Sequence, residues 1–146
     1  MAAIKSRFLG KMYRDGEVIC RQGELADCMY VIQEGQVEIL QRRKEKEFCL
    51  AVLEGGDFFG EAALLDQQTR LATARAIGDA CVLSIEKRTF FERLHEDASF
   101  AMSIIRKMSH RIHALEELLM QTCAETDISL PQRPSGYKGK AAKGDS

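Results

Sequence analysis

One short stretch of the chain brings together an acid, a cation and several glycines. Gly55, Gly56 and Gly60 allow the backbone to bend tightly and to approach a ligand where a side chain would collide. Glu61 follows directly and only accepts hydrogen bonds when it is ionised, whereas Arg70 offers a rigid fork of donors that suits a phosphate. An acceptor beside a cation would hold a molecule that carries both a hydroxyl and a phosphate, such as a sugar phosphate.

Two different elements are expected to position these side chains. The run Glu61–Leu65, Glu-Ala-Ala-Leu-Leu, has high helix propensity but is short, and the free N–H groups at the start of a helix attract anions. Arg70 stands instead at the beginning of an extended segment, Leu71–Ile77. We therefore predict a turn and a short helix after Gly60, with a strand that starts next to Arg70.

These residues resemble a known binding motif. Phe59-Gly-Glu-Ala-Ala-Leu64, followed by Arg70-Leu-Ala-Thr73, is similar to the phosphate-binding cassette of cyclic nucleotide-binding domains. The family includes bacterial cAMP receptor proteins, protein kinase A regulatory subunits and cyclic nucleotide-gated channels. The resemblance extends over roughly residues 12 to 120, because Asp15–Glu24 and Met29–Ile39 also resemble the opening strands of the family.

The resemblance implies a role for each matched residue. Arg70 would bind the cyclic phosphate, Glu61 the ribose 2′-hydroxyl, and the backbone of the short helix the remaining phosphate oxygens. The implied ligand-binding residues are Phe59, Gly60, Glu61, Ala62, Ala63, Arg70, Leu71 and Ala72. The expected ligand is cAMP, with cGMP as the alternative, because family members that prefer cGMP often have threonine where this chain has Leu71. No cofactor and no metal are expected.

The remainder of the first two thirds of the chain is rich in β-forming residues. Strands are predicted over Glu17–Arg21, Cys28–Gln33, Gln36–Arg42, Glu47–Leu53, Leu71–Ile77 and Ala80–Glu86. Regular turn signals between them favour a mainly β fold with some α, an antiparallel jelly-roll barrel that carries the short cassette helix and C-terminal helices. The charged run Arg42–Glu47 is interpreted as a solvated hairpin tip rather than a nucleic-acid patch. A short helix over residues 3–14 is also expected, although Gly10 weakens it.

Helical periodicity begins at Lys87. A short helix is predicted over Lys87–Glu96 and a long one over about 98–123. The long helix has an apolar seam formed by Ala98, Ala101, Ile105, Met108, Ile112, Leu115, Leu119 and Thr122. This seam, together with the parallel dimers of bacterial family members, predicts a homodimer through Ala98–Thr122; the alternative is that these residues all serve one intramolecular core. We expect residues 1–125 to form the binding domain, and residues 126–146 to form a disordered tail.

Bulk properties exclude several other classes of protein. The 146 residues carry a net charge of −1, so no overall field would draw the chain onto nucleic acid or membrane, and no apolar run is long enough to span a bilayer. The five cysteines lack the spacing of a zinc site, and the predicted strands contain no histidine of the kind that metal-dependent jelly-roll enzymes need. A cytoplasmic, non-catalytic sensor with an unknown downstream protein partner is expected. The alternatives are a haem or redox sensor on the same barrel, and a scaffold module without a ligand.

Overall fold

The computed structural model describes residues 9–66, 68–126, 129–132 and 134–136. The chain divides into two units, Met1–Ile104 and Ile105–Ser146. The first unit contains the strands, the cassette and the start of the last helix.

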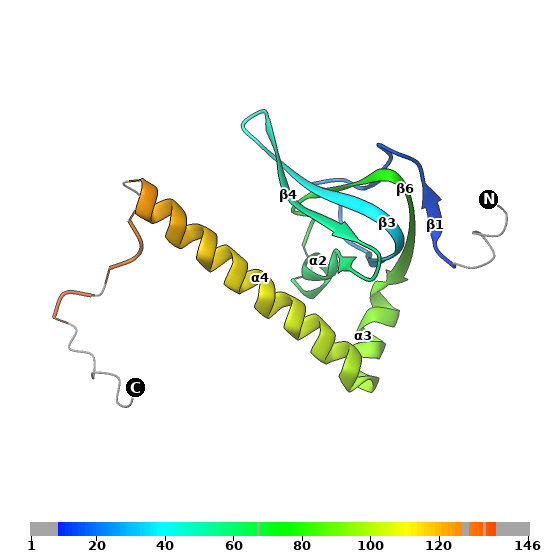
Figure 1. The fold of residues 1–146 in the computed structure, drawn as a ribbon. Coiled ribbons are helices and arrows are strands. Elements are labelled where there is room, and N and C mark those ends of the chain that lie inside the picture. Colours follow the sequence, from blue (N-terminus) through cyan, green and yellow to red (C-terminus); the bar gives the residue numbers. More distant parts are fainter. Residues whose placement is uncertain (1–8, 67, 127–128, 133, 137–146) are drawn as a thin grey trace. The chain divides into compact units, whose positions relative to one another are not determined.

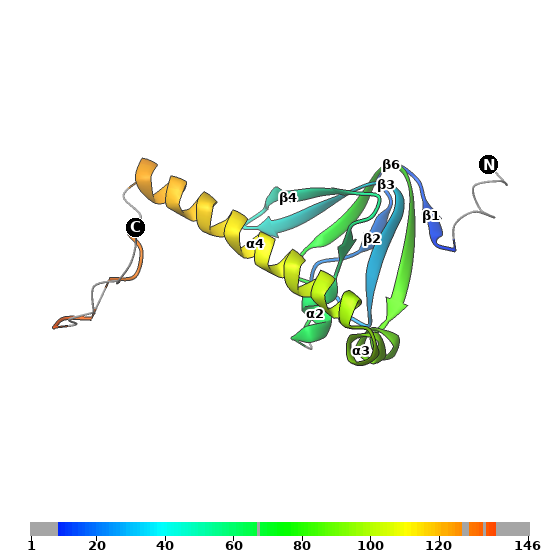
Figure 2. The same ribbon diagram turned by 60° about the horizontal axis from the view of Figure 1, so that its bottom comes forward.

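Six strands form one antiparallel sheet in the first unit. They are β1 (Lys11–Tyr13), β2 (Val18–Cys20), β3 (Cys28–Arg43), β4 (Lys46–Glu54), β5 (Phe58–Phe59) and β6 (Thr73–Glu86). The order is β1-β6-β3-β4, with β2 added to β6 and β5 added to β3. Figures 1 and 2 show the long strands β3 and β6 side by side, with β1 and β4 at the two ends of the series. The expected antiparallel, mainly β fold of jelly-roll type is confirmed, although the sheet is rolled and not closed.

The two long strands each join segments that were predicted as separate. Turns were expected at Gly35 and at Gly78, but both glycines lie inside continuous strands, with φ of 92° and 64°. The pairing of β3 with β6 shifts register on either side of Glu34, so this part of the strand forms bulges that bend it without ending it. A Cβ on Gly35 would lie 2.5 Å from the Asp79 carbonyl oxygen. The Asp79 carbonyl therefore leaves room only for glycine at position 35.

The hairpin between β3 and β4 has the tip that the charged run predicted. Its two turn residues, Lys44 and Glu45, both have positive φ, at 48° and 65°, which is typical of a tight turn between twisted strands. Arg43 pairs with Lys46 and Arg42 with Glu47 on the two sides of the tip. The interpretation of Arg42–Glu47 as a hairpin tip is therefore confirmed.

The two faces of the sheet differ in their surroundings. Ala74 and Ala76 on β6 pair with Ile39 and Val37 on β3, and their side chains enter the hydrophobic core together with Ile32. Because side chains alternate along a strand, the intervening residues point to the opposite face. We call these the inward face and the outer face of the sheet.

Three helices follow the predicted boundaries closely. The cassette helix α2 covers Glu61–Leu65, α3 covers Lys87–Glu96, and α4 covers Ala98–Glu125. Within the first unit, Phe90 of α3 is fully buried and contacts the ring of Phe100 edge to face, at 5.9 Å between centroids. Ile104, also buried, ends this part of α4.

The expected helix over residues 3–14 is wrong for the part that the structure describes. Lys11–Tyr13 form β1, which pairs with β6 so that Met12 lies opposite Cys81. Gly10 packs against the β6 backbone, where a Cβ would lie 2.7 Å from the Val82 carbonyl carbon. Hydrogen bonding to a free sheet edge outweighs the weak local helix propensity. Residues 3–8 lie outside the described residues.

The second unit consists of the remainder of α4 and the described part of the segment that follows. Several seam residues on this helix are exposed, including Ile105, Ile112, Leu115 and Leu119. The prediction of a disordered tail over 126–146 concerns mainly residues outside the described ones. The domain boundary at residue 125 stays a prediction.

Candidate functional site

The cassette begins with a turn that requires glycine. Gly60 has φ of 87° and forms the N-terminal boundary of α2, directly before Glu61. A side chain is strained in this left-handed region, and a Cβ here would lie 2.6 Å from Nη1 of Arg70. Glu61, in the first turn of α2, is completely buried, with 0% of its surface exposed. A tight turn therefore delivers a carboxylate into the interior.

Arg70 reaches the same turn from the other end of the cassette. Its side chain is buried, with 5% of the residue exposed. Nη1 donates to the Gly60 carbonyl oxygen at 3.1 Å, and Nη2 donates to the Cys28 carbonyl oxygen. The guanidinium carbon also lies 5.2 Å from the centre of the Tyr30 ring, in a cation–π contact. The structure thus brings Arg70 to the residue that precedes Glu61.

Backbone hydrogen bonds hold the main chain of Arg70 in place. Its N–H donates to the Glu24 carbonyl at 2.7 Å, and its carbonyl accepts from the Gly23 N–H at 2.8 Å. An isolated bridge between Leu25 and Thr69 adds to this pairing. The Arg70 side chain is therefore positioned by contacts of its backbone as well as by contacts of its guanidinium.

Aromatic and sulfur-containing side chains surround the Arg70 guanidinium. The rings of Tyr30 and Phe59 stack at 5.0 Å, and Cys28 Sγ lies 3.6 Å from Nη2 of Arg70. Burial raises the pKa of the Tyr30 hydroxyl above its usual value, and a hydrogen bond with Cys28 acts in the same direction. Burial also raises the pKa of the Cys28 thiol. These neighbours are thus held neutral, and Arg70 provides a fixed positive charge among them.

The other predicted residues lie around this centre at different depths. Phe59 and Ala63 are buried, Ala62 and Ala72 are half-buried, and Leu71 is 61% exposed. Gln41 donates a hydrogen bond to the Leu71 carbonyl at 3.0 Å. Arg70 therefore contacts Gly60 directly and is linked to Phe59 through the Tyr30 ring, whereas the side chain of Leu71 faces solvent.

Two neighbours of the site were missed by sequence reasoning. Cys28 and Tyr30 contact Arg70, yet they were assigned only to a predicted strand. The alternation along β3 indicates which face these residues occupy, but no spacing connects them to an arginine so distant in the chain. Their role follows from the pairing of Tyr30 with Phe59 across β3 and β5.

Comparison with known proteins agrees with this geometry. The model of the cyclic nucleotide-binding domain family matches residues 11–97, and the chain belongs to this family. The chain is 29% identical over 126 residues to the cyclic AMP receptor protein of Thermus thermophilus, an alignment that covers 86% of this chain and 53% of the relative. It is 37% identical over 86 residues to the type II regulatory subunit of cAMP-dependent protein kinase from Drosophila melanogaster, covering 59% of this chain and 23% of the relative.

Solved structures show the same fold. The crystal structure of the Thermus thermophilus catabolite activator protein superposes with a TM-score of 0.72 at 25% identity, covering 84% of this chain and 58% of that one. The regulatory domain of Toxoplasma gondii PKA, crystallised with cAMP, gives 0.59 at 31% identity, covering 68% of this chain and 38% of that one. The chain thus spans about half of the bacterial relative and a smaller share of the kinase subunits. In the described part of this chain, no helix is long and apolar enough to cross a membrane.

Proposed function

We propose that this member of the cyclic nucleotide-binding domain family binds cAMP at the cassette and acts as a regulatory sensor without catalytic activity. The observation that carries the proposal is the buried guanidinium of Arg70, which reaches the backbone of Gly60 next to the buried Glu61. A cation held away from water interacts strongly with an anion. The bacterial relative and the kinase subunits are named for cAMP, and this supports the choice of ligand.

In the proposed complex, the cyclic phosphate accepts hydrogen bonds from Arg70 and from the N–H groups at the start of α2. The Arg70 fork has five donors, and the Gly60 and Cys28 carbonyls now occupy both of its terminal nitrogens. The phosphate therefore accepts from guanidinium N–H groups that these two carbonyls do not use. Glu61 accepts from the ribose 2′-hydroxyl, while Phe59, Ala62, Ala63, Leu71 and Ala72 complete the walls.

Coupling to the C-terminal helix is the second part of the proposal. Arg70 donates to the carbonyl of Cys28, and the preceding residue, Asp27, accepts the Lys87 N–H at the start of α3 at 2.9 Å. Phe90 of α3 in turn contacts Phe100 in the first turn of α4. A change at Arg70 thus has a short chain of contacts to the beginning of α4. Ligand shifts this equilibrium only by its difference in affinity for the two positions.

We also propose that two copies associate through the exposed apolar seam of α4 and that the dimer acts on a downstream protein in the cytoplasm. Exposed seam residues such as Ile112 and Leu115 support this proposal, since a second copy would bury them. Sedimentation of a monomer at micromolar concentration, both with and without cAMP, would contradict it.

Titration calorimetry tests the ligand. We expect saturable binding of cAMP that is at least about tenfold tighter than that of cGMP, a difference of about 1.4 kcal/mol. The protein is first shown to be folded and free of co-purified nucleotide. Absence of binding of both cyclic nucleotides under these conditions would overturn the proposed function.

The role of Glu61 is tested with 2′-deoxy-cAMP. Removal of the ribose hydroxyl leaves a buried acceptor without its ligand partner, which weakens binding by about 1 to 3 kcal/mol. Glu61→Gln retains the shape of the side chain, and in this variant we expect a smaller difference between the two ligands. Equal affinity of the wild-type protein for both ligands would remove Glu61 from the ribose contact.

A further inference from the structure

A hollow in the first unit lies beside the end of the cassette at Thr73. It has a volume of about 560 Å³ and is lined by Val18, Arg21, Gln22, Gly23, Leu40, Arg42, Glu47, Thr73 and Arg75. This volume is in the range of sites that hold small molecules. None of the eight implied ligand-binding residues of the cassette lines it, although Thr73 ends the cassette motif.

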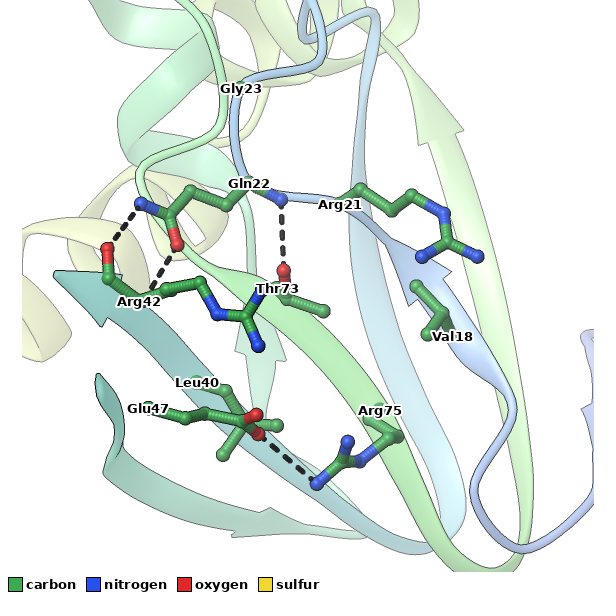
Figure 3. A pocket seen from close by; sticks show the side chains of 9 residues that line it. All are labelled: Val18, Arg21, Gln22, Gly23, Leu40, Arg42, Glu47, Thr73 and Arg75. Carbon is green, nitrogen blue, oxygen red and sulfur yellow. Dashed lines mark hydrogen bonds and ion pairs between the residues drawn. The ribbon is translucent and has the colours of Figure 1, made fainter. Parts of the chain in front are cut away.

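The hollow opens on the outer face of the sheet. Leu40 pairs with Thr73 across β3 and β6, one position from the core pair of Ile39 and Ala74. Because side chains alternate, Leu40 and Thr73 point away from the inward face that carries the core. Leu40 is nevertheless only 6% exposed, so it forms an apolar floor beneath the arginines. Figure 3 shows the lining side chains around one common space.

Gln22 braces the walls of this hollow. Its side chain donates to the Arg42 carbonyl at 3.1 Å and accepts from the Arg42 N–H at 2.8 Å. Its own N–H donates to Thr73 Oγ1 at 3.0 Å. These three hydrogen bonds, drawn in Figure 3, tie the loop after β2 to β3 and β6. The side chain of Thr73 and the backbone of Arg42 are therefore held in place before any ligand arrives.

The three arginines are not equivalent. Arg75 donates from Nε to Glu38 at 2.7 Å and lies 3.3 Å from Glu47 through Nη2, so two carboxylates compensate its charge. In contrast, the guanidinium groups of Arg21 and Arg42 have no hydrogen-bond or ion-pair partner within the described part of the chain. Two uncompensated forks therefore stand over an apolar floor.

We propose that this outer-face hollow binds a small phosphate monoester, with the phosphate on Arg21 and Arg42 and an apolar ring on Leu40 and Val18. Guanidinium forks suit the several oxygens of a phosphate dianion. The floor suits a flat apolar group, which inorganic phosphate lacks. A small molecule is favoured over a nucleic acid because the net charge of the chain is −1 and the basic side chains gather in a hollow and not along a stripe.

Phenyl phosphate is the probe that tests this proposal, with amide chemical shifts of the ¹⁵N-labelled chain as the readout. We expect saturable shifts at Gly23, Glu47 and Thr73, with little change at Gly60 and Ala62, and a dissociation constant of about 1 mM or tighter. Inorganic phosphate should bind at least about fivefold more weakly, because it gains nothing from the apolar floor. Shifts confined to the cassette, or the absence of saturation, would overturn the proposal, and equal binding of inorganic phosphate would overturn the ligand class.

Arg42→Gln is the decisive variant. Gln22 contacts only the backbone of Arg42, so the substitution leaves the brace intact, and we expect affinity for phenyl phosphate to fall by about tenfold or more. Arg43→Gln is the matched control, since Arg43 is the next residue of β3 and points to the other face. The control should stay within about twofold of the wild type. Equal losses in the two variants would indicate a non-specific charge effect and contradict the assigned site. Arg21→Gln provides a second variant, with the expected loss similar to that of Arg42→Gln.

Discussion

The cassette and the outer-face hollow, each proposed to bind an anion, present their arginines in two opposite ways. In the cassette, Arg70 is buried and its guanidinium is bonded to two backbone carbonyls. In the hollow, Arg21 and Arg42 are exposed, and their guanidinium groups have no hydrogen-bond or ion-pair partner in the described part of the chain. A buried charge must be paired because desolvation is costly, whereas an exposed charge is solvated by water and needs no partner in the protein. The Arg70 side chain is therefore part of the fold, whereas the side chains of Arg21 and Arg42 are additions to it.

The two regions share one loop. Gly23 lines the hollow, and its N–H also donates to the Arg70 carbonyl. Glu24, the next residue, accepts the Arg70 N–H. The loop that braces the outer wall thus also positions the cassette arginine from behind. A substitution in this loop would therefore be expected to affect both sites.

The largest expected effect comes from Arg70→Ala. Loss of two carbonyl contacts and of the phosphate fork should reduce cAMP affinity by about 100-fold or more, and should also lower the free energy of unfolding by about 2 kcal/mol. Titration calorimetry and urea denaturation measure the two effects. Arg42→Gln is the control, because an exposed arginine should affect neither by more than about 0.5 kcal/mol. Similar losses of stability in both variants would erase the contrast between a buried and an exposed arginine.

A smaller effect is expected for Gly60→Ala, with Gly16→Ala as its matched control. Both glycines have positive φ, 87° and 82°, so both variants incur about 1 kcal/mol of backbone strain. Only at Gly60 does the new Cβ also meet Nη1 of Arg70, and displacement of the guanidinium adds about 1 to 3 kcal/mol. Urea denaturation should separate the two variants by this amount. Equal destabilisation would show that Arg70 moves aside at no cost.

Ionic strength should change ligand affinity at the two sites to different extents, and this effect should be smaller than those of the substitutions above. Between about 50 and 500 mM NaCl, phenyl phosphate binding at the exposed arginines should weaken by about three- to tenfold, because mobile ions screen solvent-exposed charges. Binding of cAMP at the buried Arg70 should change by less than about twofold. Parallel titrations in the two buffers measure both values. A steeper salt dependence for cAMP would mean that its phosphate stays in contact with solvent.

The smallest effect concerns the two faces of the sheet at high pH. Cys20 lies in the core, and burial raises its thiol pKa, an effect that the charge of Arg70 opposes only in part. Since the thiol of the unfolded chain ionises near pH 8.5, the stabilising contribution is complete below that pH and is lost as the pH rises through the folded pKa. We expect a loss of about 1 kcal/mol between pH 8 and pH 10, measured by urea denaturation.

Cys20→Ala should reduce this dependence on pH. The control is Cys49→Ala on β4, where the side chain is exposed and pairs with Leu40 on the other side of the hairpin; it should follow the wild-type curve. The slopes are compared and not the absolute stabilities, because Cys20→Ala also leaves a small void. Identical slopes in the wild type and in both variants would assign the alkaline loss to other groups, such as Tyr30, whose pKa burial also raises.

Local sequence signals were sufficient wherever the chemistry was local. The helix after Gly60 follows from helix propensity and a glycine turn, and the charged tip of the β3–β4 hairpin follows from its position between two alternating runs. Family resemblance added the residues of the cassette. The helices α3 and α4 followed from their apolar period, with boundaries within a few residues of the prediction.

Tertiary structure decided what depends on pairing between distant residues. Gly35 and Gly78 carry turn signals, but the long pairing of β3 with β6 converts both into bends within strands. β1 formed because a free edge of β6 outweighed a weak helix signal. In the same way, Tyr30 and Cys28 became neighbours of Arg70 only through the pairing of β3 with β5 and the return of the chain at Glu24.

The sequence by itself determined the short-range features of this protein: its turns, its helix periods and the types of side chain in the cassette. Short-range features depend on propensity and spacing, which a single chain displays directly. The structure alone placed Arg42 in a braced hollow, although its sequence neighbours suggested only a solvated tip. Register between strands joins residues far apart in the chain, and a shift of one position exchanges the two faces of a sheet. For that reason the inward site could be predicted and the outer-face hollow could not.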